Sequence, residues 1–407
     1  MTKDKILIQP TLNIGIVGHV DHGKTSLTKL LSGKWTDTHS EEKKRGITIK
    51  LGYTNFIIYT NKDKTLYDLK QHDGFEPFQK LSIVDAPGHE SFMATMISGA
   101  AVMDCAILVI AANEQCPQPQ TIEHLKTLEI AGIQQIIVVQ NKIDLVTKEE
   151  AIENYKQIKE FLKGTIAQNS KIIPISAQYG ANISKLLQTI VEEFKEPDRR
   201  LQDEPIMHII RSFDINKPGE DYSQLKGGIL GGSIIQGKIK LNDKVEIKPG
   251  IKITKEGKTL YKPIYAKIVG LMSDKDKLDS AKSGGSVAVM TKLDPMITKT
   301  DSLVGQILGL KNSLPNPLEK LTFVPHLFDK VITYSSEYEV KDLYLNEPLM
   351  LIVNSLTTVG VVTKTNQNET QVTIKRPVMA FNNDRVVIFR RFEGNKWRII
   401  GHGIINV

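Results

Sequence analysis

The 407-residue chain carries near its amino-terminus a run that strongly restricts how the surrounding segment can fold. Gly18-His19-Val20-Asp21-His22-Gly23-Lys24-Thr25 matches the pattern G-x-x-x-x-G-K-[ST], follows an apolar strand candidate and opens a helical pattern. Glycines let backbone N–H groups approach phosphates without a Cβ in the way, and the positive end of a helix adds to the attraction. The run therefore predicts a phosphate-binding loop between a strand and a helix.

The residue types in this loop indicate a bound nucleotide with a metal ion. Lys24 is expected to reach the β and γ phosphates, and the Thr25 hydroxyl to ligate Mg²⁺. The alternative is a Gly-rich turn without a ligand, but the flanking strand and helix favour the phosphate loop. The predicted nucleotide contacts in the loop are His19, Val20, Asp21, His22, Gly23, Lys24, Thr25 and Ser26.

A second motif, Asp85-Ala86-Pro87-Gly88, directly follows the strand candidate Leu81–Val84. An aspartate at the carboxyl end of a strand can hold Mg²⁺, usually through water, and the backbone N–H of Gly88 can meet the γ-phosphate. His89 follows at once, and beside a γ-phosphate it could orient an attacking water. Its alternative role is that of a capping or packing residue near a helix start.

A third motif, Asn141-Lys142-Ile143-Asp144, lies after the apolar run Ile136–Val139 and indicates guanine as the base. The Asp144 carboxylate would accept from N1–H and the 2-amino group, donors that adenine lacks. The Lys142 stem would pack along the base plane. Backbone groups of Ser176, Ala177 and Gln178, after the last strand candidate, would contact the guanine oxygen. Carboxyl ends of parallel strands are where such sheets bind ligands.

Between the loop and the next strands lies a charged segment, Glu41 to Ile49, that could respond to the γ-phosphate. Thr48 is the candidate that gives its hydroxyl to Mg²⁺ and its N–H to the phosphate, so that phosphate loss releases the segment. A solvated charge run is the alternative reading, and it describes residues 41–44 well.

Strand-like and helical patterns alternate over the first 200 residues, which indicates βαβ units and a mostly parallel sheet. After the charged stretch at 196–200 the pattern changes to short strands separated by Gly pairs and Asn-Asp turns, typical of β-barrels. A further break lies at 312–317. We therefore expect an α/β domain over 1–203, a first β-barrel over 204–314 and a second over 315–407.

Composition excludes several other classes of protein. No apolar run reaches the roughly 18 to 20 residues that span a bilayer, so no membrane contact is expected. The two cysteines, Cys105 and Cys116, exclude a disulfide framework and indicate a reducing compartment, which we take to be the cytoplasm. The net charge of +7 is compatible with RNA binding and equally with a lysine-rich solvated surface. Candidate RNA contacts near the carboxyl end are Lys375, Arg376, Arg390 and Arg391.

Together these motifs resemble those of the translational GTPases, which share the sequences Gly-His-Val-Asp-His-Gly-Lys-Thr, Arg-Gly-Ile-Thr and Asp-Ala-Pro-Gly-His-Glu. The nearest likeness is to the γ subunits of archaeal and eukaryotic translation initiation factor 2. It rests on the segments 50–53, 211–219 and 227–250 and covers nearly the whole chain. The resemblance implies a P-loop GTPase domain followed by two β-barrels.

The resemblance also implies an activity and partners. Such a chain is the core of a heterotrimer that carries methionylated initiator tRNA to the small ribosomal subunit with GTP bound, and releases it after hydrolysis to GDP. The α subunit would dock on the first barrel and the β subunit on the nucleotide domain. Tyr53 would lie near the tRNA acceptor end, and Asp21 and Gly46 would give an additional Mg²⁺ contact.

Three alternative functions were weighed against this one. An elongation-type or selenocysteine-type carrier of another aminoacyl-tRNA is disfavoured by the amino-acid sequence of residues 211–219. A scaffold that binds nucleotide only structurally is disfavoured by the intact Lys24, Thr25, Thr48 and Asp85. A metabolic kinase fits poorly with a guanine motif and two β domains.

One departure from the family pattern concerns zinc. Family members usually hold two Cys-x-x-Cys pairs between the switch and the Asp-x-x-Gly motif, but Phe56–Lys80 contains no cysteine here. Its only soft ligand is His72, with Asp63, Asp68 and Asp73 nearby. We therefore predict no structural zinc, and a loop over 61–77 that is either mobile or held by other packing.

Overall fold

The computed structural model describes residues 9–35, 51–89, 92–216, 219, 221, 225–332, 337–366, 368–392 and 396–407. The chain divides into two compact units, Met1–Asp198 with Gly284–Ser286, and Arg199–Ser283 with Val287–Val407. The first holds an α/β sheet and the second two β-barrels, which confirms the predicted fold class. The finer domain bounds at 203 and 314 stay a prediction. Among the described residues, no helix has the length and apolarity to cross a membrane.

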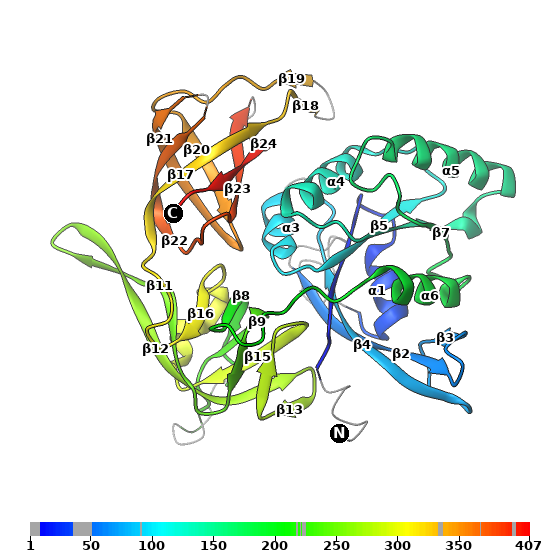
Figure 1. Ribbon diagram of the computed structural model, residues 1–407, viewed down its shortest axis with the longest axis horizontal. Coiled ribbons are helices and arrows are strands. Elements are labelled where there is room, and N and C mark those ends of the chain that lie inside the picture. The colour runs from blue at the N-terminus through cyan, green and yellow to red at the C-terminus, as the bar shows by residue number, and fades with distance from the viewer. Residues whose placement is uncertain are drawn as a thin grey trace. The chain divides into compact units, whose positions relative to one another are not determined.

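The sheet of the first unit is mostly parallel, with strand order β3-β2-β4-β1-β5-β6-β7 (Figure 1). Its strands are β1 (Asn13–Gly18), β2 (Gly52–Asn61), β3 (Tyr67–Asp68), β4 (Phe75–Asp85), β5 (Cys105–Ala111), β6 (Ile136–Asn141) and β7 (Ile172–Pro174). β4, β1, β5, β6 and β7 run parallel, whereas β2 and β3 pair antiparallel at one edge. The parallel strands therefore end together at one edge of the sheet.

Helices connect the parallel strands: α1 (Lys24–Ser32), α3 (Met93–Ala100), α4 (Pro119–Ala131), α5 (Lys148–Leu162) and α6 (Ile183–Glu193), with a 3₁₀ turn η3 (Ile143–Leu145). Local sequence explains their ends. α5 starts at a capping box in which Thr147 and Glu150 each bond the other's backbone N–H. α4 begins with Pro119 and stops at Gly132, which adopts a left-handed φ of 77°.

The central strands are buried on both faces, which is why they read as unbroken apolar runs rather than alternating ones. Every residue of β5 is buried, and Ile107, Leu108 and Val109 have no exposed surface. The same holds for Ile137 and Val138 of β6. This rigid core holds the strand ends, and the polar residues that follow them, in fixed positions.

Within 61–77, the region predicted as a loop, the structure has the end of β2, the short strand β3 and the start of β4, joined by turns. β2 continues to Asn61 and pairs with both β3 and β4. Tyr67 packs edge-on against Phe78 with ring centroids 6.0 Å apart, and the Lys64 ammonium lies 5.5 Å from the Phe78 ring. Side-chain packing therefore holds this segment, the second of the two alternatives.

Other elements were not predicted from the sequence. The helix α3 and the strand β17 (Leu318–Leu327) lie in stretches for which no element was proposed. The strand β2 was likewise not assigned. Its partners across the sheet, more than its own residues, explain its length, since it pairs with β4 from Gly52 to Asn61.

The first barrel of the second unit has the strand order β11-β16-β8-β9-β15-β12, and a β11–β12 pairing closes it. Its elements are β8 (Ile206–Phe213), β9 (Ile229–Gln236), β10 (Lys238–Lys240), β11 (Lys244–Lys255), β12 (Lys258–Ser273), β13 (Asp276–Leu278), β14 (Ser280–Lys282), β15 (Ser286–Thr291), α7 (Pro295–Thr298), η5 (Lys299–Asp301) and β16 (Ile307–Leu310). Arg211 Nε donates to Asp301 Oδ1 at 3.0 Å and so ties β8 to η5.

The second barrel closes in the order β17-β22-β21-β20-β23-β24. Besides β17 its strands are β20 (Pro348–Val353), β21 (Leu356–Thr365), β22 (Thr370–Val378), β23 (Arg385–Phe392) and β24 (Lys396–Ile405), with a separate pair, β18 (Lys330–Ile332) and β19 (Glu337–Glu339). From Leu356 to Thr363, β21 alternates strictly between buried and exposed residues. This alternation is the pattern of a strand with one face in a core and one in solvent.

A buried charged pair anchors the segment that joins the two barrels. The Lys248 ammonium donates to the carbonyls of Leu314 and Pro315 at 2.7 and 3.2 Å and lies 3.5 Å from Glu246. Glu246 accepts in turn from the Leu314 N–H at 2.8 Å. Because both side chains are buried, every polar group of this junction depends on the others for its hydrogen bonds.

We predict that Lys248→Met destabilises the barrel unit by about 3 kcal/mol, because it leaves the Glu246 carboxylate buried without its cation. The double variant Lys248→Met/Glu246→Leu should be less destabilised than the single one, since no unpaired charge remains. Urea unfolding followed by circular dichroism measures both. Equal stability of Lys248→Met and the unmodified chain would contradict a structural role for the pair.

Candidate functional site

The predicted phosphate loop joins β1 to α1 and has the backbone that such a loop requires. Gly18 and Gly23 adopt φ angles of 138° and 91°. A Cβ on Gly18 would lie 2.3 Å from the Val109 carbonyl oxygen, and one on Gly23 would lie 2.3 Å from the Asn141 amide nitrogen. Glycine is therefore required at both positions, for conformation and for space. The loop leads directly into the amino-terminus of α1, and helix amino-termini attract anions.

Lys24 and Gly88 bring the first two motifs into contact. Lys24 is almost fully buried, and its ammonium donates to the His19 carbonyl at 2.6 Å. A Cβ on Gly88 would lie 2.3 Å from this nitrogen and 3.0 Å from the Gly18 carbonyl oxygen. The segment after β4 therefore passes directly over the lysine, as expected if both contact one terminal phosphate.

The other residues of the second motif lie on the same edge. Asp85 is fully buried at the end of β4, where it pairs in register with Ile16 of β1. His89 is half-buried, with its ring 5.9 Å from that of Phe92. Thr25 is half-buried in the first turn of α1. Asp85 thus ends β4, while Lys24 and Thr25 open the helix that follows the adjacent parallel strand β1.

Asn141 connects the phosphate loop to the third motif. Its amide donates to the His22 carbonyl at 2.9 Å and accepts from the Ala177 N–H at 3.0 Å, and the side chain is 2% exposed. One side chain therefore holds the loop after β1, the end of β6 and the segment after β7 together. The sequence predicted that these motifs converge but not that Asn141 is the connection.

Around Asn141 the remaining base-reading candidates differ in their exposure to solvent. Asp144 is exposed within η3, and Lys142 precedes it in a left-handed conformation with φ 63°. Ser176 and Ala177 are buried, whereas Gln178 is exposed. An exposed carboxylate after β6 and the Ala177 backbone after β7 therefore follow neighbouring strands at the same edge of the sheet.

The two loop histidines, both predicted nucleotide contacts, have their rings among other groups of the protein. The His22 ring is directed inward: Nδ1 donates to the Val109 carbonyl at 3.1 Å, and Nε2 lies 3.4 Å from Glu114. Burial lowers the pKa of His22 to about 4, and the nearby Lys24 charge adds to the effect. Only the backbone of His22 is available to a phosphate. Burial, followed by the proximity of His22, likewise lowers the pKa of His19 to about 4.

Sequence reasoning missed a third histidine beneath the loop. His124 of α4 has no exposed surface, and its Nδ1 accepts from the Gly18 N–H at 2.8 Å. Burial, with Lys24 nearby, places the pKa of His124 well below its usual value, so the ring is neutral. A lone histidine in a helical pattern carries no sequence signal for this contact, because only the packing of α4 against β1 creates it.

Several predicted positions lie elsewhere. Thr48 and Gly46, the switch candidates for Mg²⁺, fall outside the described residues. Tyr53 is half-buried on β2, where it pairs with Val84 of β4. In the described part of the chain, no three His, Cys, Asp or Glu side chains are grouped to hold a metal ion. The Asp68 carboxylate and His72 instead bond each other at 3.1 Å. The expected lack of structural zinc stays a prediction.

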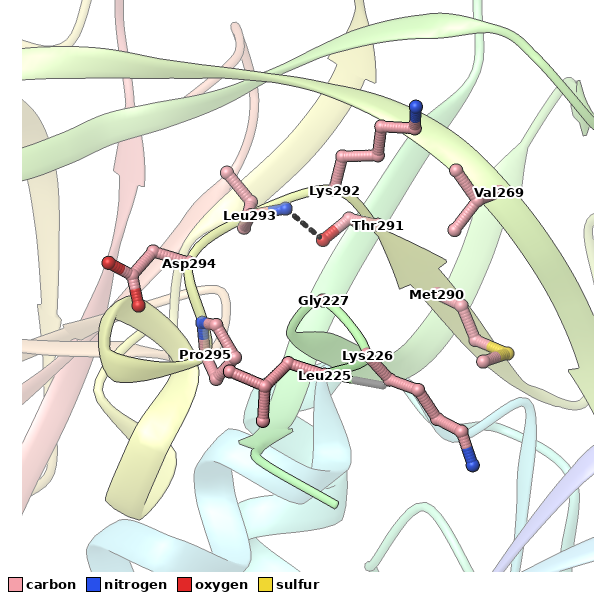
Figure 2. A pocket seen from close by; sticks show the side chains of 10 residues that line it. All are labelled: Leu225, Lys226, Gly227, Val269, Met290, Thr291, Lys292, Leu293, Asp294 and Pro295. Carbon is pink, nitrogen blue, oxygen red and sulfur yellow. Dashed lines mark hydrogen bonds between the residues drawn. The ribbon is translucent and has the colours of Figure 1, made fainter. Parts of the chain in front are cut away.

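A pocket of about 860 Å³ opens on the first barrel. Figure 2 shows the side chains that line it: Leu225, Lys226, Gly227, Val269, Met290, Thr291, Lys292, Leu293, Asp294 and Pro295. Thr291 shapes its floor, since the hydroxyl donates to the Gly228 carbonyl at 2.7 Å and accepts from the Leu293 N–H at 3.2 Å. The apolar walls carry two lysines and one aspartate, which suits a planar ligand with an anionic group.

Among the candidate RNA contacts of the second barrel, Arg390 is engaged within the protein. It is 14% exposed, forms an ion pair with the buried Glu347, and donates to the Lys341 carbonyl at 2.7 Å. Arg376 is half-buried, and burial lowers its pKa. Lys375 and Arg391 are exposed. Arg390 is therefore a structural residue, and the expectation that it contacts RNA does not fit its surroundings.

Comparison with known proteins relates this geometry to a family. Residues 9–196 match the elongation factor Tu GTP binding domain, and residues 319–405 match the carboxyl-terminal domain of initiation factor eIF2 gamma. Translation initiation factor 2 subunit gamma of Methanocaldococcus jannaschii is 51% identical over 413 residues, with 100% of both chains covered. The Methanococcus maripaludis protein of that name is 51% identical over 405 residues, 98% of each chain.

Solved structures show the same fold at lower identity. A bacterial selenocysteine-specific elongation factor matches with a TM-score of 0.75 and 24% identity, over 97% of this chain and 58% of that one. Elongation factor SelB from Methanococcus maripaludis, in complex with the GTP analogue GPPNHP, matches with a TM-score of 0.74 and 24% identity, over 98% of this chain and 80% of that one. At this identity the likeness concerns the fold alone.

A phosphate loop, a guanine motif and two β-barrels in this order define a translational GTPase, a hydrolase. Within that class, the chain belongs to the family of translation initiation factor 2 subunit gamma. The prediction from sequence is confirmed, and initiation is supported over the elongation-type and selenocysteine-type alternatives.

We predict that Asn141→Ala weakens GTP and GDP binding alike by at least about tenfold, because two buried partners lose their hydrogen bonds at about 1–3 kcal/mol each. Isothermal titration with each nucleotide measures the effect. Asn182→Ala is the matched control, since this amide bonds to the Pro174 carbonyl near the same edge but is exposed. Unchanged affinities in Asn141→Ala would show that the three segments hold their positions without it.

Proposed function

We propose that this chain is a GTP-dependent carrier of methionylated initiator tRNA that delivers it to the small ribosomal subunit and hydrolyses GTP to GDP as the release switch. The observation that carries the proposal is the convergence of Lys24, Gly88 and Asn141 at one strand edge, in a chain of the initiation factor 2 gamma family. The chain would deliver the tRNA in the cytoplasm, as part of a heterotrimer with α and β subunits.

GTP would lie along the strand edge with its two ends held by different motifs. Asp144 would accept from the guanine, with the Lys142 stem along the base plane and the Ala177 backbone near the guanine oxygen. The phosphates would lie against the N–H groups of residues 19–26. Lys24 would exchange its bond to the His19 carbonyl for the β and γ phosphates. Gly88 would give its N–H to the γ-phosphate.

A magnesium ion would be held at the same edge. Asp85 at the end of β4 and the Thr25 hydroxyl in the first turn of α1 would supply hard oxygen ligands. Thr48, Asp21 and Gly46 would complete the contacts. When bound, Mg²⁺ compensates phosphate charge. His89 follows Gly88 directly and would position the water for hydrolysis.

The tRNA would be held by its acceptor end. The pocket on the first barrel would receive it, and Lys226 and Lys292 at its lining would meet phosphate oxygens (Figure 2). Tyr53 would lie near the acceptor end as well. The α subunit would dock on the first barrel and the β subunit on the nucleotide domain.

Replacing Asp144 tests the assignment of the base. In Asp144→Asn the amide no longer accepts two protons from guanine, so we expect GTP affinity to fall about 100-fold and xanthosine triphosphate to be accepted in its place. Competition of each triphosphate against a fluorescent analogue measures this preference. A variant that still prefers GTP would show that Asp144 does not face the base.

Competition between methionylated initiator tRNA and elongator aminoacyl-tRNAs tests the carrier function. With the heterotrimer, we expect selective binding of initiator tRNA that is at least about tenfold tighter in GTP than in GDP, a coupling of the usual size between two ligands. Filter binding at fixed salt measures both ratios. Equal affinity in the two nucleotides would reject the switch, and preference for an elongator tRNA would reject the role in initiation.

A further inference from the structure

The outer face of the second barrel carries an apolar patch that the GTP and tRNA sites do not use. Pro348 pairs with Val361 and Met350 with Val359 across β20 and β21. Directly opposed residues lie on the same face, here the outer one, since the alternate residue Leu349 is buried in the core. Val359 and Val361 are 37% and 39% exposed.

The turn before β20 enlarges this surface. Tyr344 and Leu345 are 60% and 58% exposed, side by side in sequence, and the Asn346 N–H donates to the Val362 carbonyl at 2.9 Å, which places the turn beside β21. We call Tyr344, Leu345, Pro348, Met350, Val359 and Val361 the barrel-2 patch. Contiguous exposed apolar residues of this kind mark interaction sites on soluble proteins.

An internal clamp makes the turn rigid. Arg390 forms an ion pair with the buried Glu347 and donates to the carbonyls of Lys341 and Asp342 at 2.7 and 3.1 Å. Glu347 also accepts from the Tyr344 N–H at 3.2 Å. Two charged side chains thus fix a turn whose tip exposes a tyrosine and a leucine. A preorganised aromatic anchor binds a partner at low entropic cost.

The surroundings of the patch are basic. Lys375 is exposed on β22, one residue after Ile374, which pairs with Gly360. Arg391 is exposed on β23, two residues after Phe389, which pairs with Met350, so it lies on the same outer face. Its guanidinium stacks on Trp397 at 4.8 Å. The patch therefore has an aliphatic centre with a cation on each flanking strand.

We propose that the barrel-2 patch is the docking surface for a protein partner that presents an apolar stripe bordered by Asp and Glu side chains. An aliphatic centre offers phosphates and bases no hydrogen-bond partners, so RNA fits it poorly, whereas a protein with an apolar stripe buries it. The flanking cations speed association with an acidic rim and fix its register. The inference depends on neither GTP nor tRNA binding.

Photo-crosslinking tests the surface directly. The chain with p-benzoylphenylalanine in place of Tyr344 is assembled with the other two subunits, GTP, initiator tRNA and small ribosomal subunits, and crosslinked peptides are identified by mass spectrometry. The control carries the probe in place of Ile152, which is 48% exposed on α5. We expect a crosslink from position 344 to an acidic, apolar segment of a protein component, well above the control.

Other outcomes overturn the proposal: crosslinks only to RNA, crosslinks only to a second copy of this chain, or yields no higher than the Ile152 control. GTP affinity and tRNA affinity are measured on the same preparation. If these stay normal while the crosslink fails, the docking surface alone is rejected. If they fail while the crosslink persists, only the carrier function is rejected.

Charge reversal is a second test, in which the affinity for the partner identified by the crosslink is measured. Lys375→Glu with Arg391→Glu should weaken its binding at least about tenfold and remove the salt dependence of association. Lys148→Glu, exposed on α5, should change neither. The thermal midpoint and GTP affinity of the double variant should match those of the unmodified chain. Unchanged partner affinity in the double variant would overturn the role of the basic flanks.

Discussion

The amide of Asn141 is the contact on which the nucleotide edge depends. It bonds the His22 carbonyl on one side and the Ala177 N–H on the other, while the Gly23 backbone lies so close that a Cβ there would meet it at 2.3 Å. The phosphate loop and the base-reading segments are connected through one buried side chain. The positions of the two segments therefore depend on the same buried amide.

Beneath this edge, two buried histidines with lowered pKa values bond backbone groups next to the phosphate loop. His22 donates to the Val109 carbonyl and His124 accepts from the Gly18 N–H, and burial lowers the pKa of each. Two neutral rings satisfy backbone groups of the loop without adding positive charge next to Lys24. Lys24 then remains the cation at the place where Gly88 approaches the loop.

In the barrels, unlike the central strands of the α/β sheet, buried and exposed residues alternate along strands such as β21, so that one face lies in the core and the other outside. The outer face is apolar at Val359 and Val361. The Arg390–Glu347 ion pair holds the turn next to this face. Where the chain passes from one barrel to the other, Lys248 and Glu246 hold the connecting backbone. Buried charges in this unit thus fix backbone geometry rather than contact ligands.

The sequence alone determined the fold class and the order of the motifs, because the phosphate loop, the aspartate after β4 and the guanine motif are local patterns that need particular residue types at short spacing. The lengths of β2 and β17 and the pairing of β3 with β2 were not predicted, since they depend on partners across a sheet. Only the tertiary structure decided that His22 turns inward, that His124 bonds Gly18 and that Arg390 clamps a turn. These contacts join residues 43 to 106 positions apart, and no local pattern encodes them.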